Sequence, residues 1–317
     1  MPLRIAPTPS SPAGSRAGFT LIELVAVMTI LGIIAAVVAL FMRDPVRAYV
    51  DTARRSELSD VADTALRRMA RDIRLALPNS LRVTTVGGNV YFELLQTKTG
   101  GRYRAQADNA GAGDTLNLSS TDTTFDTLSP LNAVSGPIVA GDILVVHNLF
   151  ALQTQPESNA YTYNQAGSSC TSATPFFPTC NTATIAGPDT AGALANERHI
   201  TFASRQFPLA SPGSRFSVVS SVSGAVTYVC PSAAATDAKG NGTGALTRVS
   251  VYAITLNQQT PPAGTSSALA NNVTACNIQY DQQALTQNHG IVSMQLSITR
   301  GGETVSLYHE VHVSNVP

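Results

Sequence analysis

One acidic side chain stands alone in an apolar stretch near the start of this 317-residue chain. Residues 19–42 read FTLIELVAVMTILGIIAAVVALFM, in which Glu23 is the only charged residue. An ionised carboxylate in an apolar helix costs on the order of 2.5–3.5 kcal/mol to place in a membrane, so such a residue usually has a function. The chemistry open to it is pairing with a cation from another molecule, because pairing removes two charges from the apolar surroundings at once.

The residues just before Glu23 have the spacing of a processing signal. Glu23 lies four residues after Phe19, and Phe19 directly follows Gly18. The run GFTLIEL that contains them resembles the type IV prepilin signature, in which a dedicated peptidase cuts after the glycine. A short leader that carries Arg4 and Arg16 precedes the run, as in that signature.

The resemblance implies how this segment matures and what it contacts. It implies cleavage between Gly18 and Phe19 by a prepilin peptidase, N-methylation of the new Phe19 amine, and retention of the helix in the product. The Phe19 amine of one subunit would then pair with Glu23 of the next as their helices bundle. We therefore expect contacts with other major and minor pilins through this helix, and with an inner-membrane assembly platform.

The apolar run is long enough to cross a membrane. At about 1.5 Å per residue, residues 19–42 span roughly 36 Å as a helix, against about 30 Å of hydrocarbon. Arg4 and Arg16 place the N-terminus in the cytoplasm by the positive-inside rule, and the rest of the chain in the bacterial periplasm. A secretory signal cut within the Ala-rich stretch 35–39 and a plain membrane anchor are the competing interpretations, but neither accounts for Glu23.

The helix that positions these residues should continue beyond the membrane. The sequence divides into a cytoplasmic leader at 1–18, a long helix at 19–78 and a β-rich periplasmic domain at 79–317. Apolar residues recur at helical spacing and should pack on the β domain: Val50, Leu58, Val61, Ala65, Met69, Ile73 and Leu77. Acid–arginine and arginine–acid pairs four residues apart, such as Arg68 and Asp72, fit either a solvated helix face or contacts between subunits. Pro45 should bend the helix and Pro78 should end it.

After residue 79 the apolar pattern alternates with a period of two, so the fold class is α+β with an antiparallel β-rich domain. Gly87-Gly88-Asn89 predicts a turn within 81–96, and Gly301-Gly302 predicts a hairpin of 291–299 with 303–313. Further strands are expected at 115–118, 143–147, 200–203, 216–220, 225–230 and 249–256. Irregular loops are expected near 153–196, 231–244 and 258–272, which lack periodicity.

Four cysteines lie in the second half of the chain. Cys170, Cys180, Cys230 and Cys276 allow three pairings, and none forms a C-x-x-C pair. We favour Cys170 with Cys180, closing a short loop, and Cys230 with Cys276, joining two strand ends. Four buried free thiols are the alternative, which an exported chain makes less attractive.

The polar residues do not form a recognisable catalytic constellation, so we predict no enzyme activity, no metal and no cofactor. His309 and His312 are three apart, which places them on opposite faces of a strand. The glycine-rich stretch 240–244 lacks the Lys-Ser/Thr ending of a phosphate-binding loop. Residues 79–317 carry ten basic and thirteen acidic residues, so we expect no nucleic-acid partner.

A narrower resemblance comes from the C-terminal part. TYVC at 227–230, LANNV at 269–273 and the final EVHVSNVP resemble the MshO minor pilins of MSHA-type pili. More distantly, the chain resembles pseudopilin J of general secretion systems. The resemblance implies a minor pilin that helps start a filament, placed just below the tip or within the fibre because Glu23 is retained. A secretion pseudopilin and a pilus-borne adhesin subunit are the alternatives.

Overall fold

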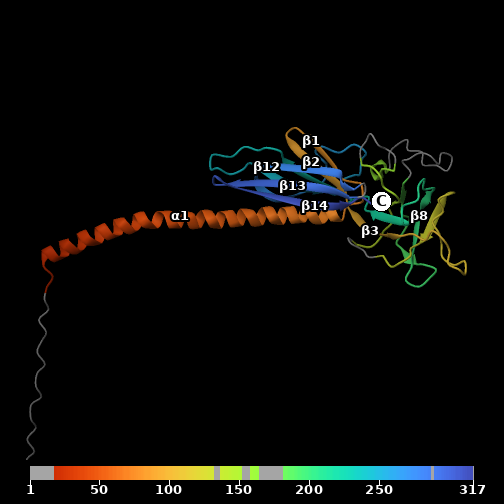
Figure 1. The fold of residues 1–317 in the computed structure, drawn as a ribbon, viewed down its shortest axis with the longest axis horizontal. Coiled ribbons are helices and arrows are strands. Elements are labelled where there is room, and N and C mark those ends of the chain that lie inside the picture. The colour runs from red at the N-terminus through yellow and green to blue at the C-terminus, as the bar shows by residue number, and fades with distance from the viewer. Residues whose placement is uncertain (1–17, 132–135, 152–157, 164–180, 287–288, 317) are drawn as a thin grey trace, which may run out of the picture. The chain divides into compact units, whose positions relative to one another are not determined.

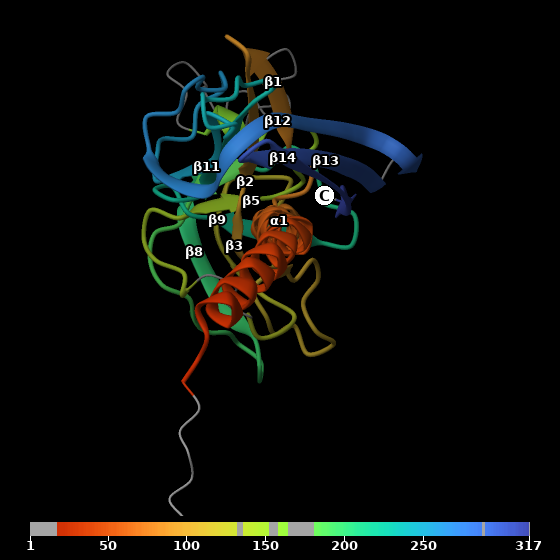
Figure 2. The same cartoon turned by 90° about the vertical axis from the view of Figure 1, so that its left-hand side faces the viewer.

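The computed structural model describes residues 18–131, 136–151, 158–163, 181–286 and 289–316. It divides into two compact units, Met1–Ala53 and Arg54–Pro317. A long apolar N-terminal helix is followed by a β-rich antiparallel domain with a curled sheet (Figures 1 and 2), which confirms the predicted α+β class.

Helix α1 runs from Leu21 to Arg74, and Pro45 lies within it. The helix ends four residues before Pro78, so the predicted stop at Pro78 was wrong. The reason is that the backbone already pairs with the sheet at that point. The amide of Leu77 donates to the carbonyl of Leu95 at 2.7 Å, and Ala76 forms a β-bridge with Gln96.

The main sheet of the second unit has seven antiparallel strands in the order β1-β2-β10-β11-β12-β13-β14. Six of its neighbouring strand pairs are antiparallel, and β12 is long enough to pair with both β11 and β13. The strands are β1 Arg82–Val86, β2 Asn89–Leu95, β10 Ala225–Pro231, β11 Gly244–Ser250, β12 Thr265–Thr286, β13 His289–Arg300 and β14 Glu303–Ser314.

A second group of strands is inserted between β2 and β10, which are neighbours in the main sheet. This inserted lobe, residues 97–219, holds one sheet in the order β3-β9-β5-β6 and another in the order β4-β8-β7. Figure 1 shows β3 and β8 beyond the end of the main sheet. Its elements are β3 Thr97–Arg102, β4 Asp122–Asp126, β5 Ile143–Val145, the 3-10 helix η1 Ala160–Thr162, β6 Thr182–Thr184, β7 Thr190–Ala191, β8 Arg198–Arg205 and β9 Arg215–Val219.

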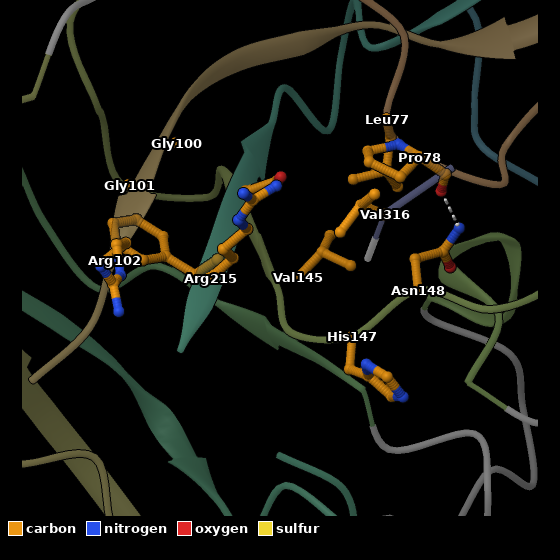
Figure 3. Close-up of a pocket in the computed structure, with 12 residues that line it drawn as sticks. Leu77, Pro78, Gly100, Gly101, Arg102, Val145, His147, Asn148, Arg215 and Val316 are labelled. Carbon is orange, nitrogen blue, oxygen red and sulfur yellow. Dashed lines mark hydrogen bonds between the residues drawn. The ribbon is translucent and has the colours of Figure 1, made fainter. Parts of the chain in front are cut away.

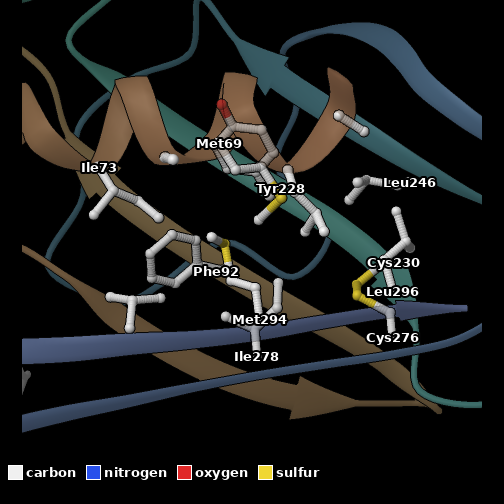
Figure 4. Packing of buried hydrophobic residues seen from close by; sticks show 14 of the residues in the cluster. Met69, Ile73, Phe92, Tyr228, Cys230, Leu246, Cys276, Ile278, Met294 and Leu296 are labelled. Carbon is white, nitrogen blue, oxygen red and sulfur yellow. A yellow bond between two sulfur atoms is a disulfide. The ribbon is translucent and has the colours of Figure 1, made fainter. Parts of the chain in front are cut away.

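The end of α1 packs on the main sheet, as its apolar stripe predicted. Leu58, Ala65, Met69 and Ile73 are buried in one cluster with sheet residues such as Phe92 (Figure 4). Two other positions of the predicted stripe behave differently, since Val50 and Val61 remain exposed. The inserted lobe has a separate core around its aromatic residues Tyr103, Phe125, Phe202, Phe207 and Phe216. The main sheet has a core where α1 covers its apolar face, and the inserted lobe has a second core of its own.

Three local predictions need correction. Residues 115–118 form no strand, and the next strand, β4, begins at Asp122. The strand predicted at 249–256 is displaced: β11 ends at Ser250, and Val251 has a positive φ of 61° that turns the chain away from the sheet. The second part of the predicted loop 258–272 is the start of β12.

Glycine turns were read correctly at two hairpins. Gly87 and Gly88 have φ of 58° and 78° between β1 and β2, and Gly301 and Gly302 have φ of 58° and 82° between β13 and β14. Two successive residues of positive φ are what a tight antiparallel hairpin needs, and glycine adopts that conformation without a Cβ penalty. In β14 the buried Val311 and Val313 alternate with exposed neighbours, as the alternating pattern predicted.

The side chain of Asp72, near the end of α1, lies in the interior of the β-rich unit and not on the helix surface. We expected Arg68 and Asp72 to pair on the helix surface, but the Asp72 side chain is buried. Its carboxylate accepts hydrogen bonds from the Tyr228 hydroxyl at 2.7 Å and from Nε of Arg248 at 2.8 Å, while Arg68 lies 3.6 Å away. Burial, and then the nearby Asp72 charge, raises the pKa of Tyr228. The carboxylate thus ties the helix to β10 and β11.

Cys230 and Cys276 form a disulfide, which is one of the two pairings that we favoured. It joins β10 to β12 across the intervening β11, within the cluster that packs on α1 (Figure 4). Cys170 and Cys180 lie outside the described residues, so that pairing stays a prediction.

Removing this disulfide is expected to destabilise the β-rich unit considerably. The bond closes a loop of 46 residues, and a loop of that length corresponds to about 4 kcal/mol of lost unfolded-state entropy. We expect Cys230→Ala with Cys276→Ala to lower the free energy of unfolding by about 2–4 kcal/mol in chemical denaturation. The comparison belongs in a Cys170→Ala, Cys180→Ala background, where adding a reductant should affect only the chain that keeps the disulfide. Equal stability of the two chains would contradict the assignment.

Candidate processing and assembly site

Helix α1 begins directly after the residues that the sequence marks for processing. Gly18, Phe19 and Thr20 precede the helix, and space around Gly18 is open. A peptidase needs an extended and accessible backbone on both sides of the bond that it cuts. The bond between Gly18 and Phe19 lies outside the helix and is exposed, so its geometry suits cleavage.

Thr20 caps the helix, a role that the sequence reasoning missed. Its Oγ1 accepts a hydrogen bond from the Glu23 amide at 3.3 Å, and its carbonyl accepts one from the Leu24 amide at 3.1 Å. The spacing of Thr20 and Glu23 is that of a capping box, S/T-x-x-E, and this spacing is the signal that could have revealed the cap. The cap fixes the helix start so that Glu23 lies in the first turn.

In water, Glu23 would simply stabilise the start of the helix, because an acid in the first turn interacts favourably with the helix dipole by about 0.3–1 kcal/mol. That gain is smaller than the cost of about 2.5–3.5 kcal/mol for a charge in an apolar membrane environment. Within the described part of the chain, the Glu23 carboxylate makes no ion pair. It is therefore open to a cation from outside the molecule.

The surface around Glu23 is apolar and uncovered. Phe19, Leu21 and Ile22 have exposed fractions of 81%, 82% and 77%. Helix α1 contains a window with mean hydropathy 2.9, none of it buried within the molecule, and is the one described helix long and apolar enough to span a membrane. A continuous apolar surface of this kind requires lipid or other helices around it.

Other polar clusters in the described residues serve the fold. The Asp237 carboxylate accepts hydrogen bonds from the amides of Lys239 and Asn241. The Asn241 side chain accepts one from the Gly301 amide, so the loop that holds Asp237 and Asn241 is fastened to the β13–β14 hairpin. The hydrogen bonds from Asn241 hold the pKa of Asp237 below its usual value. No group of three His, Cys, Asp or Glu side chains with metal-site geometry occurs in the described ranges.

Asp126 and His199 form a second buried polar contact, with 2.7 Å between Oδ1 and Nδ1. Burial alone would raise the pKa of Asp126, but hydrogen bonds from the Asp114 amide, His199 and the Ala193 amide outweigh it and lower the pKa. The pair joins β4 to β8 at the edge of the lobe's core, with Asp126 buried and His199 partly exposed.

Comparison with known proteins locates a recognised motif at the same place. The prokaryotic N-terminal methylation motif matches residues 14–39, which include Gly18, Phe19 and Glu23. No curated protein and no solved structure matches the chain. The motif and the apolar helix that contains it support a membrane-anchored, type IV pilin-like role for this chain, as a pilin or a pseudopilin.

Proposed function

We propose that this chain is a minor pilin of an MSHA-like type IV pilus, with a structural rather than an enzymatic role. The observation that carries the proposal is the combination of an exposed Gly18–Phe19 bond with a Glu23 carboxylate, one helical turn later, that makes no ion pair with any residue the structure describes. Cleavage creates a cation at Phe19, and Glu23 supplies the matching anion within an otherwise apolar surface. The two charges are useful to each other only when subunits meet in the membrane.

In this proposal the chain enters the inner membrane with its N-terminus in the cytoplasm and its β-rich unit in the periplasm. A prepilin peptidase removes residues 1–18 and the new Phe19 amine is methylated. The assembly platform then brings several pilins together, and their apolar helices bundle away from lipid. A low-copy subunit of this kind helps to start the filament.

Processing is tested by the mass of the mature protein. Expressed with a prepilin peptidase and extracted from membranes, the chain should begin at Phe19 and carry one added methyl group. Gly18→Leu should block cleavage and leave the leader attached, whereas Gly14→Leu, a glycine of the same leader, should be processed normally. A product cut within 35–39, or one that keeps the leader in the unchanged chain, would contradict the proposal.

A pseudopilin of a secretion system would share the same processing, so the second arm of the test is genetic. Deleting this chain in its native cell should abolish or strongly reduce surface fibres. Intact fibres with secreted proteins trapped in the periplasm would favour the pseudopilin instead. Intact fibres that no longer attach to surfaces would favour an adhesin subunit.

A further inference from the structure

A cavity of about 410 Å³ lies where the end of α1 meets the inserted lobe, and the proposed pilin role does not use it (Figure 3). One wall comes from the connection between α1 and β1, and the floor comes from strands β3, β9 and β5. The lining residues that matter below are Leu77, Arg102, Val145, His147, Arg215 and Val316. A volume of this order is within the range of small-molecule sites, about 300–1,000 Å³.

The strand register places three basic residues in one row across the floor. Arg102 of β3 is directly opposite Arg215 of β9. Val145 of β5 is opposite Ser217 of β9, so His147, two residues further along, comes level with Arg215. Cross-strand partners, and residues two apart on a strand, share a face, which places Arg102 and Arg215 on the face of Val145. His147 follows the end of β5 and also lines the cavity.

The two arginines make an unfavourable pair unless something negative joins them. Like charges directly opposite in an antiparallel pair destabilise a sheet. Among the described residues neither Arg102 nor Arg215 forms an ion pair, and the one side-chain hydrogen bond from Arg102 goes to the carbonyl of Gly213 at 2.8 Å. By contrast, Arg104 and Arg198 of the same lobe each contact a carboxylate. The chain thus neutralises Arg104 and Arg198 and leaves Arg102 and Arg215 exposed beside a cavity.

His147 adds a polar atom with an unmet hydrogen bond. Its φ is 58°, a conformation that a non-glycine residue rarely adopts and that often marks a functional position. Its Nδ1 is buried and has no hydrogen-bond partner in the described parts of the chain. Burial lowers the pKa of the ring, so the neutral imidazole can donate or accept a hydrogen bond at neutral pH.

The opposite wall is apolar and already in place. Leu77 and Val145 are buried, and Val316 stands beside them (Figure 3). The neighbouring Pro78 is held by a 2.8 Å hydrogen bond from Nδ2 of Asn148 to its carbonyl. The wall needs no rearrangement to receive a ligand, which reduces the cost of binding.

We propose that this cavity binds a small carboxylate-bearing ligand of about the size of one sugar ring, such as a hexuronic acid. The planar carboxylate meets the guanidinium groups of Arg102 and Arg215, which match it in shape and charge. The Nε2 of His147, the ring nitrogen that is not enclosed by the protein, hydrogen-bonds a ring hydroxyl, and the carbon-bound hydrogens of the ring lie on the apolar wall. One monoanion between two arginines removes their mutual repulsion.

The test is calorimetric titration of the mature full-length protein in detergent micelles. D-glucuronate should bind saturably, and D-glucose, which has the same ring without the carboxylate, should not. Arg102→Gln and Arg215→Gln should each weaken glucuronate binding about tenfold or more, since each removes a charge-assisted hydrogen bond to the carboxylate. Arg71→Gln, at an exposed arginine of α1 away from the cavity, should leave it unchanged.

Stability provides a second readout, because the arginines are proposed for binding and not for folding. Each glutamine variant should keep or slightly raise the melting temperature of the unliganded protein, as it removes a like-charge contact. The proposal is overturned by glucuronate binding that does not saturate or that survives both substitutions. Tighter binding of inorganic phosphate than of glucuronate would overturn the carboxylate assignment as well.

Discussion

Glu23→Ala is expected to leave processing and membrane insertion intact while nearly abolishing incorporation into filaments. The substitution removes the anion that would neutralise the Phe19 amine of a neighbouring subunit. Leaving one partner of such a buried pair uncompensated costs about 3–5 kcal/mol, so incorporation should fall by about a hundredfold or more. Insertion should improve if anything, because the carboxylate itself costs about 2.5–3.5 kcal/mol in the membrane. The measurement is the amount of mature subunit in sheared fibres relative to membranes.

Glu23→Ala is expected to insert into the membrane as well as before or better, and yet to enter filaments poorly. A general folding or expression defect would lower both insertion and incorporation. Thr29→Val is the matched control, since Thr29 is another polar residue of the apolar run whose hydroxyl bonds within its own helix, to the Ala26 carbonyl at 2.9 Å. It should assemble normally. Glu23→Gln keeps the size and removes the charge, so it should fail as Glu23→Ala does. Fibres with normal amounts of either Glu23 variant would rule out the pairing.

The parts of the fold that sequence predicts well are those set by local chemistry. Paired glycines located two hairpins because few other residues adopt successive positive φ angles. The alternation in β14 was visible because one face of that strand is buried and the other exposed. The methylation motif was recognisable for a similar reason: Gly18, Phe19 and Glu23 lie within a few residues of each other.

The errors arise where burial is decided by distant segments. Tyr252 and Ile254 alternate like a strand, but they are buried by packing against residues such as Tyr161 after the chain has left the sheet. Residues 265–272 are rich in Ser, Asn and Ala and resemble a loop, yet β11 supplies their hydrogen-bond partners. The burial of Asp72 depends on Tyr228, more than 150 residues away. Helical or strand periodicity carries no information on such partners.

The candidate site shows the same division between local and distant determinants. The sequence predicted cleavage after Gly18 and a role for Glu23, and both stay predictions, but it did not predict that Thr20 caps the helix and sets the position of Glu23 within its first turn. The row formed by Arg102, Arg215 and His147 was not predicted at all, because β3, β9 and the segment that follows β5 each contribute one residue to it. Only the register of β3, β9 and β5 brings these residues together.

The buried ion pair between Arg82 and Glu93 is the other feature from which we expect a large effect. The two residues are cross-strand partners on β1 and β2, only 4% and 1% exposed, with 2.9 Å between Nε and Oε2. Arg82 also donates to the carbonyls of Thr255 and Leu256, and its guanidinium lies 3.6 Å from the ring centre of Tyr161. The pair therefore fastens two loops to the sheet.

Glu93→Leu is expected to lower the free energy of unfolding of the β-rich unit by about 3–5 kcal/mol. The substitution leaves the Arg82 charge buried, and arginine does not lose its proton in proteins. It also removes the acceptor of the Tyr252 hydroxyl, which bonds Glu93 at 3.2 Å. The measurement is chemical denaturation in detergent micelles, followed by the near-ultraviolet circular dichroism of the tyrosines.

Arg82→Met should show a different dependence on pH, because the residue left behind can take up a proton. Burial already raises the pKa of Glu93, and removing Arg82 raises it further. A carboxyl whose folded pKa lies above its unfolded value, about 4.3, destabilises the fold increasingly as pH rises above that value. The destabilisation of Arg82→Met relative to the unchanged chain should therefore shrink as pH falls from 7 toward 5. That of Glu93→Leu should not shrink.

An exposed pair provides the control for burial. Arg67 and Asp63 are four apart on α1 with 2.6 Å between Nε and Oδ2, yet their side chains are 73% and 46% exposed. Asp63→Ala should change the free energy of unfolding by less than about 1 kcal/mol, because water screens such a pair. The distances in the two pairs are similar, so burial alone should separate their effects. Equal small losses for Asp63→Ala and Glu93→Leu would mean that water reaches Glu93, and the loops around residues 161 and 256 would then not be held by this pair.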